Sequence, residues 1–156
     1  MYLIKFLTMK RVLVITAAFL INGCSLFAPS VQLNTVRIDV ELKANNDTPV
    51  ALDFVAASDV LMLERLKSTT ASQWFEQRQQ LQRDYPGGVR IWSLEVVPGQ
   101  LLDVSNIPLH GRKAEGVLIF ARYSTPGAHR LLLQAQHSIW LKLGNREMRL
   151  LDAKGQ

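Results

Sequence analysis

The strict alternation of apolar and charged residues after position 35 is the feature that most constrains the fold. The run is Val36-Arg37-Ile38-Asp39-Val40-Glu41-Leu42-Lys43. Successive side chains of a β-strand point to opposite faces, so a period of two places every apolar side chain of this run on one face. The segment is therefore predicted to be a strand with one face in a core and the other in solvent.

Similar short apolar segments, separated by turn-forming residues, recur along the chain. Val50, Leu52 and Phe54 resume the alternation after the turn-rich stretch 44–49, and we expect these first two strands to form a hairpin with a longer loop. The strongly apolar run 116–123 is expected to be a central strand. Further strands are predicted at 89–97, 101–104, 130–133, 138–143 and 147–151.

The pattern changes between residues 58 and 83, where helix formers replace the alternation. A helix is predicted over 59–67 with Ser58 as its N-cap, and a second over 71–83, where Thr70 and Gln73 have the spacing of a capping box. Pro86-Gly87-Gly88 must end the second helix. The chain is therefore expected to be mainly β, a sandwich of seven or eight strands with a short helical insertion.

The only cysteine, Cys24, lies at the end of the only long apolar run. Lys5, Lys10 and Arg11 precede the uncharged run 12–21, which is typical of an export signal and shorter than the roughly 20 residues that a membrane-spanning helix needs. Ile21-Asn22-Gly23-Cys24 resembles the lipobox of bacterial lipoproteins, in which the cysteine is cleaved free and acylated, for example with palmitate. A plain secretory signal with an incidental cysteine, and an uncleaved anchor, are the alternatives.

On this interpretation the chain divides into a signal peptide (1–23), a lipidated tether (24–32) and a β-sandwich domain (33–156). Ser25 follows Cys24 in place of the aspartate that retains many lipoproteins in the inner membrane, so the resemblance implies an outer-membrane anchor facing the periplasm. A single cysteine allows no intramolecular disulfide, so the domain must be held by packing.

The chain carries no recognisable catalytic motif. It lacks a Gly-x-Ser-x-Gly elbow, a phosphate loop and a dinucleotide fingerprint, and His110, His129 and His137 lack metalloprotease spacing. Its formal charge of +5 is partly due to the signal, and the remaining charges are scattered in both signs, which argues against a nucleic-acid site. We expect no enzyme, no cofactor and no metal; ligation by the three histidines is the alternative.

The aromatic and arginine residues allow two interpretations each. Trp74, Phe75, Tyr85, Trp92 and Trp140 are expected to fill the core and the seam beneath the helices, with a ligand pocket as the alternative. Arg78, Arg83 and Arg90 are expected on a solvated face, with an acidic partner as the alternative.

Several features in this order resemble the TssJ/SciN lipoprotein family of the type VI secretion system. They are the lipobox at Cys24, a strand followed by Asn45 and Pro49-Val50, the helices around Trp74-Phe75, Val97-Pro98-Gly99, the run 117–123 and the strand 130–133. The resemblance implies a transthyretin-like β-sandwich that binds the C-terminal periplasmic domain of the inner-membrane protein TssM and helps to build a trans-envelope complex.

In that family the loop between the first two strands contacts the partner. It corresponds here to a short stretch, Ala44, Asn45, Asn46, Asp47 and Thr48. A lipoprotein of another secretion apparatus, an envelope ligand-binding lipoprotein and a lipid-anchored hydrolase remain as other interpretations.

Overall fold

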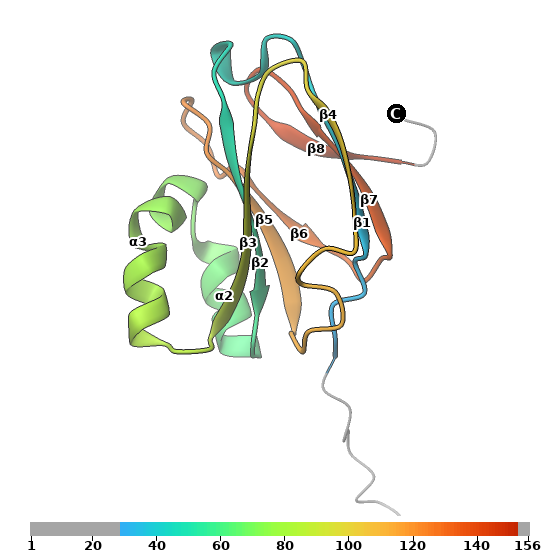
Figure 1. The fold of residues 1–156 in the computed structure, drawn as a ribbon. Helices are drawn as coiled ribbons and strands as arrows, with labels where there is room; N and C mark the ends of the chain where they lie inside the picture. Colours follow the sequence, from blue (N-terminus) through green and yellow to red (C-terminus); the bar gives the residue numbers. More distant parts are fainter. Residues whose placement is uncertain (1–28, 153–156) are drawn as a thin grey trace, which may run out of the picture.

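The computed structural model describes residues 29–152, so Cys24 and the predicted signal peptide lie outside the described residues. Within residues 29–152, eight strands form two four-stranded sheets, and a helix pair packs against the outside of one sheet (Figure 1). The strands are β1 (Thr35–Val40), β2 (Val50–Ala57), β3 (Val89–Val96), β4 (Leu101–Ser105), β5 (Gly116–Ala121), β6 (Arg130–Leu133), β7 (Ser138–Leu143) and β8 (Met148–Leu151). The helices are α2 (Val60–Ser68) and α3 (Ala71–Asp84), together with a short 3-10 helix, η1 (Ala44–Asn46). The prediction of a mainly β sandwich with a helical insertion is confirmed.

The two sheets have the strand orders β4-β1-β7-β8 and β3-β2-β5-β6. The β1–β7 pair is parallel, with Thr35 opposite Ser138, and the other pairs are antiparallel. The sheets face each other across a common core, in which Ile38, Phe54 and Leu141 are fully buried. Strands from the start and the end of the chain are thus neighbours in one sheet.

The predicted hairpin between the first two strands is wrong. β1 pairs with β4 and β7, whereas β2 pairs with β3 and β5 in the other sheet, so the connection between β1 and β2 crosses the sandwich. Leu42, predicted within the first strand, lies beyond its end and is 80% exposed. Alternation determines which face of a strand is buried but not which strand becomes its neighbour.

The helix pair lies between β2 and β3, as predicted, but the first cap differs from the expected one. Asp59, rather than Ser58, is the N-cap of α2, and its carboxylate accepts a hydrogen bond from the Met62 backbone N–H at 2.9 Å. A carboxylate is favoured there because it also compensates the positive end of the helix dipole. The capping box at α3 is confirmed, with Thr70 and Gln73 bonding reciprocally.

β2 and β5 are buried on both faces. Ile119 points into the sandwich core, while Leu118 and Phe120 belong to a second core beneath the helices. β5 lies between β2 and β6, so the predicted central position of this run is confirmed. Burial on both faces explains why the run is continuously apolar rather than alternating.

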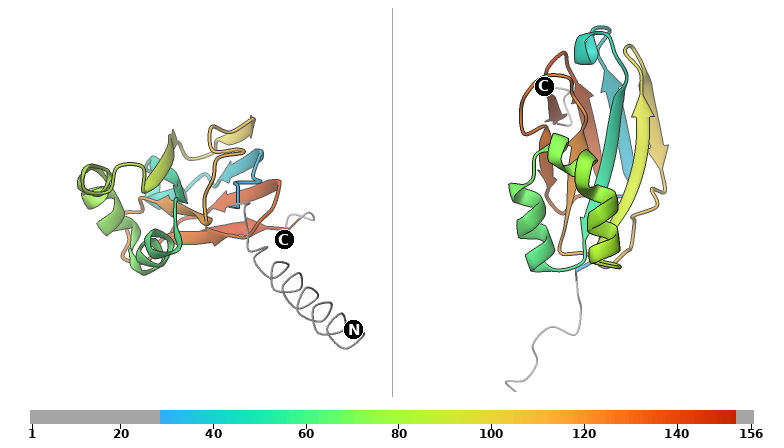
Figure 2. Two further views of the ribbon diagram at one scale, coloured as in Figure 1. Left: turned by 90° about the horizontal axis from the view of Figure 1, so that it is seen from below. Right: turned by 90° about the vertical axis from the view of Figure 1, so that its left-hand side faces the viewer.

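The two ends of the sandwich carry different connections (Figures 1 and 2). The connections 41–49, 97–100, 122–129 and 144–147 lie together at one end, which we call the four-loop end. The described chain begins at the other end, at Pro29, where α2 starts and α3 finishes; we call this the entry end. The backbone N–H of Ala114 donates to Pro29 O at 3.0 Å, and that of Glu115 donates to Ala57 O at 2.8 Å. These bonds hold the chain start beside the end of β2.

Candidate functional site

The predicted partner-binding residues 44–48 form a tight left-handed turn at the four-loop end. Asn45, Asn46 and Asp47 have φ angles of 49°, 57° and 63°. Residues other than glycine rarely adopt these positive φ angles. Asparagine and aspartate tolerate them best because their short polar side chains form hydrogen bonds with the nearby backbone. The Asn-Asn-Asp sequence is therefore well suited to this backbone.

Asn45 anchors the turn rather than presenting itself to a partner. Its side chain is almost fully buried; Oδ1 accepts from the Ser124 backbone N–H at 2.6 Å, and Nδ2 donates to Pro49 O at 3.1 Å. A buried amide bonded at both ends is strongly oriented. Asn45 therefore ties the β1–β2 connection to the β5–β6 connection, and the residues that a partner can reach are Asn46, Asp47 and Thr48.

Further bonds join the β7–β8 connection to this turn and to Tyr123 of the β5–β6 connection. The Asn46 backbone N–H donates to Asn145 Oδ1 at 3.2 Å, and the Tyr123 hydroxyl donates to Glu147 O at 2.8 Å. Burial raises the pKa of Tyr123, and the nearby carboxylates Glu41 and Glu147 raise it further, so the hydroxyl remains a donor at neutral pH. The turn is thus fixed by neighbours on two other connections.

An exposed apolar group lies beside the turn. Leu42, Val97 and Leu101 are 80%, 51% and 63% exposed. They lie on the adjacent β1–β2 and β3–β4 segments, which are joined by hydrogen bonds from the Gly99 backbone N–H to Val40 O and Glu41 O. A Cβ atom at Gly99 would lie 3.0 Å from Leu42 Cδ2, so glycine allows the leucine to pack against this segment. The four-loop end therefore offers a rigid polar turn and an apolar patch side by side.

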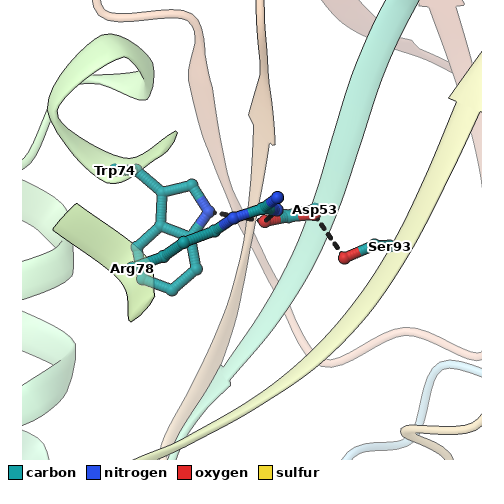
Figure 3. Close-up of polar contacts among 4 residues, drawn as sticks. All are labelled: Asp53, Trp74, Arg78 and Ser93. Atoms are coloured by element: carbon teal, nitrogen blue, oxygen red, sulfur yellow. Dashed lines mark hydrogen bonds and ion pairs between the residues drawn. The ribbon is translucent and has the colours of Figure 1, made fainter. Parts of the chain in front are cut away.

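A buried carboxylate holds the helix pair to its sheet (Figure 3). Asp53 of β2 is 1% exposed; it accepts from Trp74 Nε1 at 2.8 Å and from Ser93 Oγ at 2.6 Å, and forms an ion pair with Arg78. The expectation that Arg78 lies on a solvated face is wrong, because a carboxylate buried at this depth requires a cation and donors. We call Asp53, Trp74, Arg78 and Ser93 the helix clamp. Arg83 and Arg90 are exposed, as predicted.

The tryptophans occupy different environments. Trp74 stacks on Phe120 beneath α3, with ring centroids 5.0 Å apart, and Trp92 packs against Phe54 at 4.7 Å; packing in core and seam is confirmed for both. Trp140 instead lies on the outer face of the β4-β1-β7-β8 sheet, where it lines a cleft of about 650 Å³. The Arg37 guanidinium lies 5.5 Å above the Trp140 ring and forms an ion pair with Asp103.

The three histidines do not converge. His110 Nδ1 lies 3.3 Å from Leu33 O, and the His129 ring stacks on Tyr123 with its Nε2 2.8 Å from Thr125 O. Among residues 29–152, no group of three or more His, Cys, Asp or Glu side chains is arranged to hold a metal ion. Over the same residues, no helix combines the length and hydrophobicity needed to cross a membrane.

The fold is a β-sandwich of the TssJ type, as comparison with solved structures shows. TssJ1, a type VI secretion lipoprotein from Pseudomonas aeruginosa, matches with a TM-score of 0.60 and 12% identity over 79% of this chain and 96% of that one. Serratia marcescens Lip, a membrane-bound component of the type VI secretion system, matches with a TM-score of 0.54 and 10% identity, covering 76% and 95%.

A structure described as the C-terminal domain of the type VI secretion protein TssM from EAEC also matches. Its TM-score is 0.59 at 14% identity, covering 77% of this chain and 98% of that one. No protein-family model matches the chain, and no curated protein matches its sequence. The structural neighbours thus include TssJ lipoproteins that share this fold across most of the chain, at sequence identities that carry little information on individual residues.

Two features of this region went beyond what the residue pattern indicated. The buried anchoring role of Asn45 depends on Ser124, a residue distant in sequence. One feature of the sequence could have pointed to the helix clamp. It is Asp53, the lone acidic residue in the apolar run Val50-Ala51-Leu52-Asp53-Phe54-Val55. A carboxylate in a strand buried on both faces needs a cation, but the sequence does not indicate which arginine supplies it.

Proposed function

We propose that this protein is a non-enzymatic assembly lipoprotein of a type VI secretion system, anchored by lipid on Cys24 in the outer membrane and facing the periplasm. In this proposal the turn 44–48 binds the periplasmic domain of a TssM-like inner-membrane protein through its exposed residues Asn46, Asp47 and Thr48, while the buried Ala44 and Asn45 hold the backbone in place. The observation that carries it is the rigid left-handed turn displayed at the end opposite the chain entry. The likeness in fold to TssJ lipoproteins supports it.

The turn has the physical properties of a preformed docking element. Three consecutive left-handed residues are held by Asn45 and by the β5–β6 and β7–β8 connections, so binding would not have to order a flexible loop. Preorganisation removes a cost that a mobile loop pays on association. The adjacent Leu42, Val97 and Leu101 supply apolar area that a purely polar turn would lack.

The anchor can be tested separately from the docking. Cys24→Ala is expected to remove the acylation site, leaving the protein soluble in the periplasm or stalled as a precursor. Mass spectrometry of the mature protein and fractionation of membranes measure both effects. An unchanged mature mass and unchanged membrane fractionation would contradict the lipid anchor.

The docking test replaces side chains while retaining the backbone. In Asn46→Gly/Asp47→Gly, glycine adopts positive φ readily, so the turn persists while its exposed side chains are lost. Asn106→Gly is the matched control, since Asn106 is exposed with a φ of 56° in the β4–β5 connection.

Crosslinking and pull-down from the native envelope, with identification by mass spectrometry, should recover a large inner-membrane protein with the parent and with Asn106→Gly. The double variant should lose that protein. Equal recovery by the double variant would refute the turn as the contact, and recovery of no such protein by the parent would refute the assembly function.

A second candidate, binding of an envelope glycan, is favoured by one observation, the Trp140 cleft. Its indole lies beside the charged pair Arg37 and Asp103, and sugars bind to combinations of aromatic faces and polar groups. Titration with soluble peptidoglycan fragments, monitored by tryptophan fluorescence, tests it: a saturable change that Trp140→Ala abolishes would support glycan binding, and an absent change would reject it.

A further inference from the structure

The entry end exposes its own apolar strip. Val60 and Leu61, in the first turn of α2, are 57% and 84% exposed, and Tyr85, the C-cap of α3, is 48% exposed. Leu61 and Arg65 are four residues apart and therefore share a face of α2. The Arg65 guanidinium lies 5.3 Å above the Tyr85 ring. Leu61, Arg65 and Tyr85 are therefore neighbours on this surface, and Val60 precedes Leu61 in the first turn of α2. We call these four residues the entry strip.

The strip lies where the chain enters the domain. Pro29 is bonded to Ala114, and the next residue, Glu115, is bonded to Ala57 at the end of β2. The backbone N–H of Ser58 in turn donates to Gly88 O at 3.0 Å, which joins the start of α2 to the turn after α3. Figures 1 and 2 both show that the start of α2 and the end of α3 lie at this end of the molecule.

The covalent chain limits how far this end can lie from Cys24. Five residue steps separate Cys24 from Pro29. A fully extended chain spans at most about 3.6 Å per residue, so the reach is no more than about 18 Å. A domain held by lipid on Cys24 therefore keeps its entry end close to the headgroups.

We propose that the entry strip is a lipid-contact surface that inserts Val60, Leu61 and Tyr85 into the headgroup region of the bilayer. This proposal rests on the Cys24 anchor of the proposed function. Removing leucine and valine side chains from water is favourable in free energy. Tyrosine is enriched at membrane interfaces because its ring is apolar and its hydroxyl is polar. Arg65 can keep its charged group at phosphate level while its methylene stem remains among apolar side chains.

The charges at this end indicate that burial of apolar side chains, rather than electrostatic attraction, is the main contribution to the proposed membrane contact. Both signs are exposed at this end: the basic residues are Arg83, Arg90, Arg112 and Lys113, and the acidic residues are Asp59, Asp84 and Glu115. With both signs present, electrostatic attraction to anionic lipid is modest. Insertion should therefore occur on zwitterionic as well as on partly anionic membranes.

Such a contact would orient the domain. A lipid chain on a tether restricts distance but not direction, whereas a second contact through the entry strip would direct the four-loop end away from the membrane. Residues 44–48 would then face a partner arriving across the periplasm.

Two positions of similar exposure allow a matched test, namely Leu61 at 84% and Leu42 at 80%. The chain has no cysteine other than Cys24, whose sulfur is blocked in a lipidated protein, so Leu61→Cys and Leu42→Cys each add a single reactive thiol. The full lipidated variants, labelled with the environment-sensitive fluorophore NBD, are reconstituted in vesicles of phosphatidylethanolamine with a minor fraction of phosphatidylglycerol. A parallel sample uses phosphatidylcholine alone.

We expect NBD at position 61 to show blue-shifted, brighter emission that spin-labelled lipids quench in both vesicle types. NBD at position 42 should keep its spectrum in water. Water-like spectra at both positions in protein that floats with the vesicles would overturn the lipid contact while leaving the anchor intact. Protein that fails to float would overturn both. A shift at position 61 that appears only when a protein partner is added would assign the strip to protein docking and overturn the proposal.

Discussion

The four-loop end and the entry end expose similar apolar side chains in different settings. Leu42 is 80% exposed and Leu61 84%, and each has two further exposed apolar residues nearby. At the four-loop end the apolar residues lie beside a turn fixed by side-chain hydrogen bonds, whereas at the entry end they lie on helix termini beside the start of the described chain. Exposure alone therefore does not identify a partner. What distinguishes the two ends is the position of each patch relative to the chain entry.

The largest expected effect comes from removing the carboxylate of the helix clamp. Asp53→Ala leaves the buried Trp74 N–H without an acceptor and Arg78, whose side chain is 33% exposed, without its counter-ion, and we expect a loss of about 2–4 kcal/mol in the free energy of unfolding. Chemical denaturation measures it. Since the clamp residues Trp74 and Arg78 lie on α3, hydrogen exchange should increase mainly in the helix pair rather than at the four-loop end.

Asp103→Ala is the matched control for this substitution, because Asp103 is also a strand aspartate paired with an arginine but is 58% exposed. Exposed pairs contribute about 0–1 kcal/mol. Equal losses in the two variants would contradict the structural importance of the clamp.

The next effect should be confined to the four-loop end. Asn45→Ala removes the side-chain hydrogen bonds to the Ser124 backbone N–H and to Pro49 O, and it places alanine at positive φ. We expect a loss of about 1–3 kcal/mol together with faster hydrogen exchange in 41–49 and 122–129.

The spectra of a label at the entry end should be unaffected by Asn45→Ala. If exchange increased equally at both ends, the two ends would not be independent, and the comparison between them would fail.

A pair of surface substitutions separates the two ends by function. Leu42→Ser and Leu61→Ser should each change stability by no more than about 0.5 kcal/mol, since both side chains are largely exposed. Leu42→Ser should weaken capture of the partner by about 1 kcal/mol in binding free energy and leave lipid contact unchanged.

Leu61→Ser should have the reverse effect, with reduced quenching of a label at Tyr85→Cys by spin-labelled lipid and normal capture of the partner. Variants that impaired both functions, or neither, would remove the distinction between the ends.

The smallest expected effect is a change in how stability depends on pH under acidic conditions. Hydrogen bonds from the Met62 backbone and from Ser58 lower the pKa of Asp59 in the folded protein below the value of 3.8 for an unperturbed carboxyl. Because the folded pKa is depressed, the stabilisation is present above pH 3.8 and is lost as pH falls through the folded pKa.

Asp59→Asn keeps a good N-cap without a titrating group, so its thermal midpoint should fall less steeply than that of the parent below this pH. Parallel slopes for the two proteins would show that Asp59 does not contribute to acid sensitivity at the entry end.

Local patterns allowed most of the elements to be predicted, since local physics decides them. The alternation in 36–40, the continuous apolar run in 116–121 and the Thr70–Gln73 capping box each determine an element through the residues themselves. The Asn-Asn-Asp turn belongs to the same class, because the preference of these residues for positive φ is intrinsic. The choice between Ser58 and Asp59 as N-cap was a local ambiguity between adjacent candidates.

Apart from that N-cap, the wrong predictions concern contacts between segments that are distant in the sequence. The sequence by itself determined which face of β1 is buried, where the helices interrupt the strands and that no disulfide within the chain holds the fold. Only the tertiary structure decided that β1 and β2 belong to opposite sheets, that Arg78 neutralises Asp53 and that Asn45 is buried against Ser124. The physical reason is that periodicity and capping act over a few residues, whereas sheet partners and buried polar pairs depend on how the whole chain shares one core.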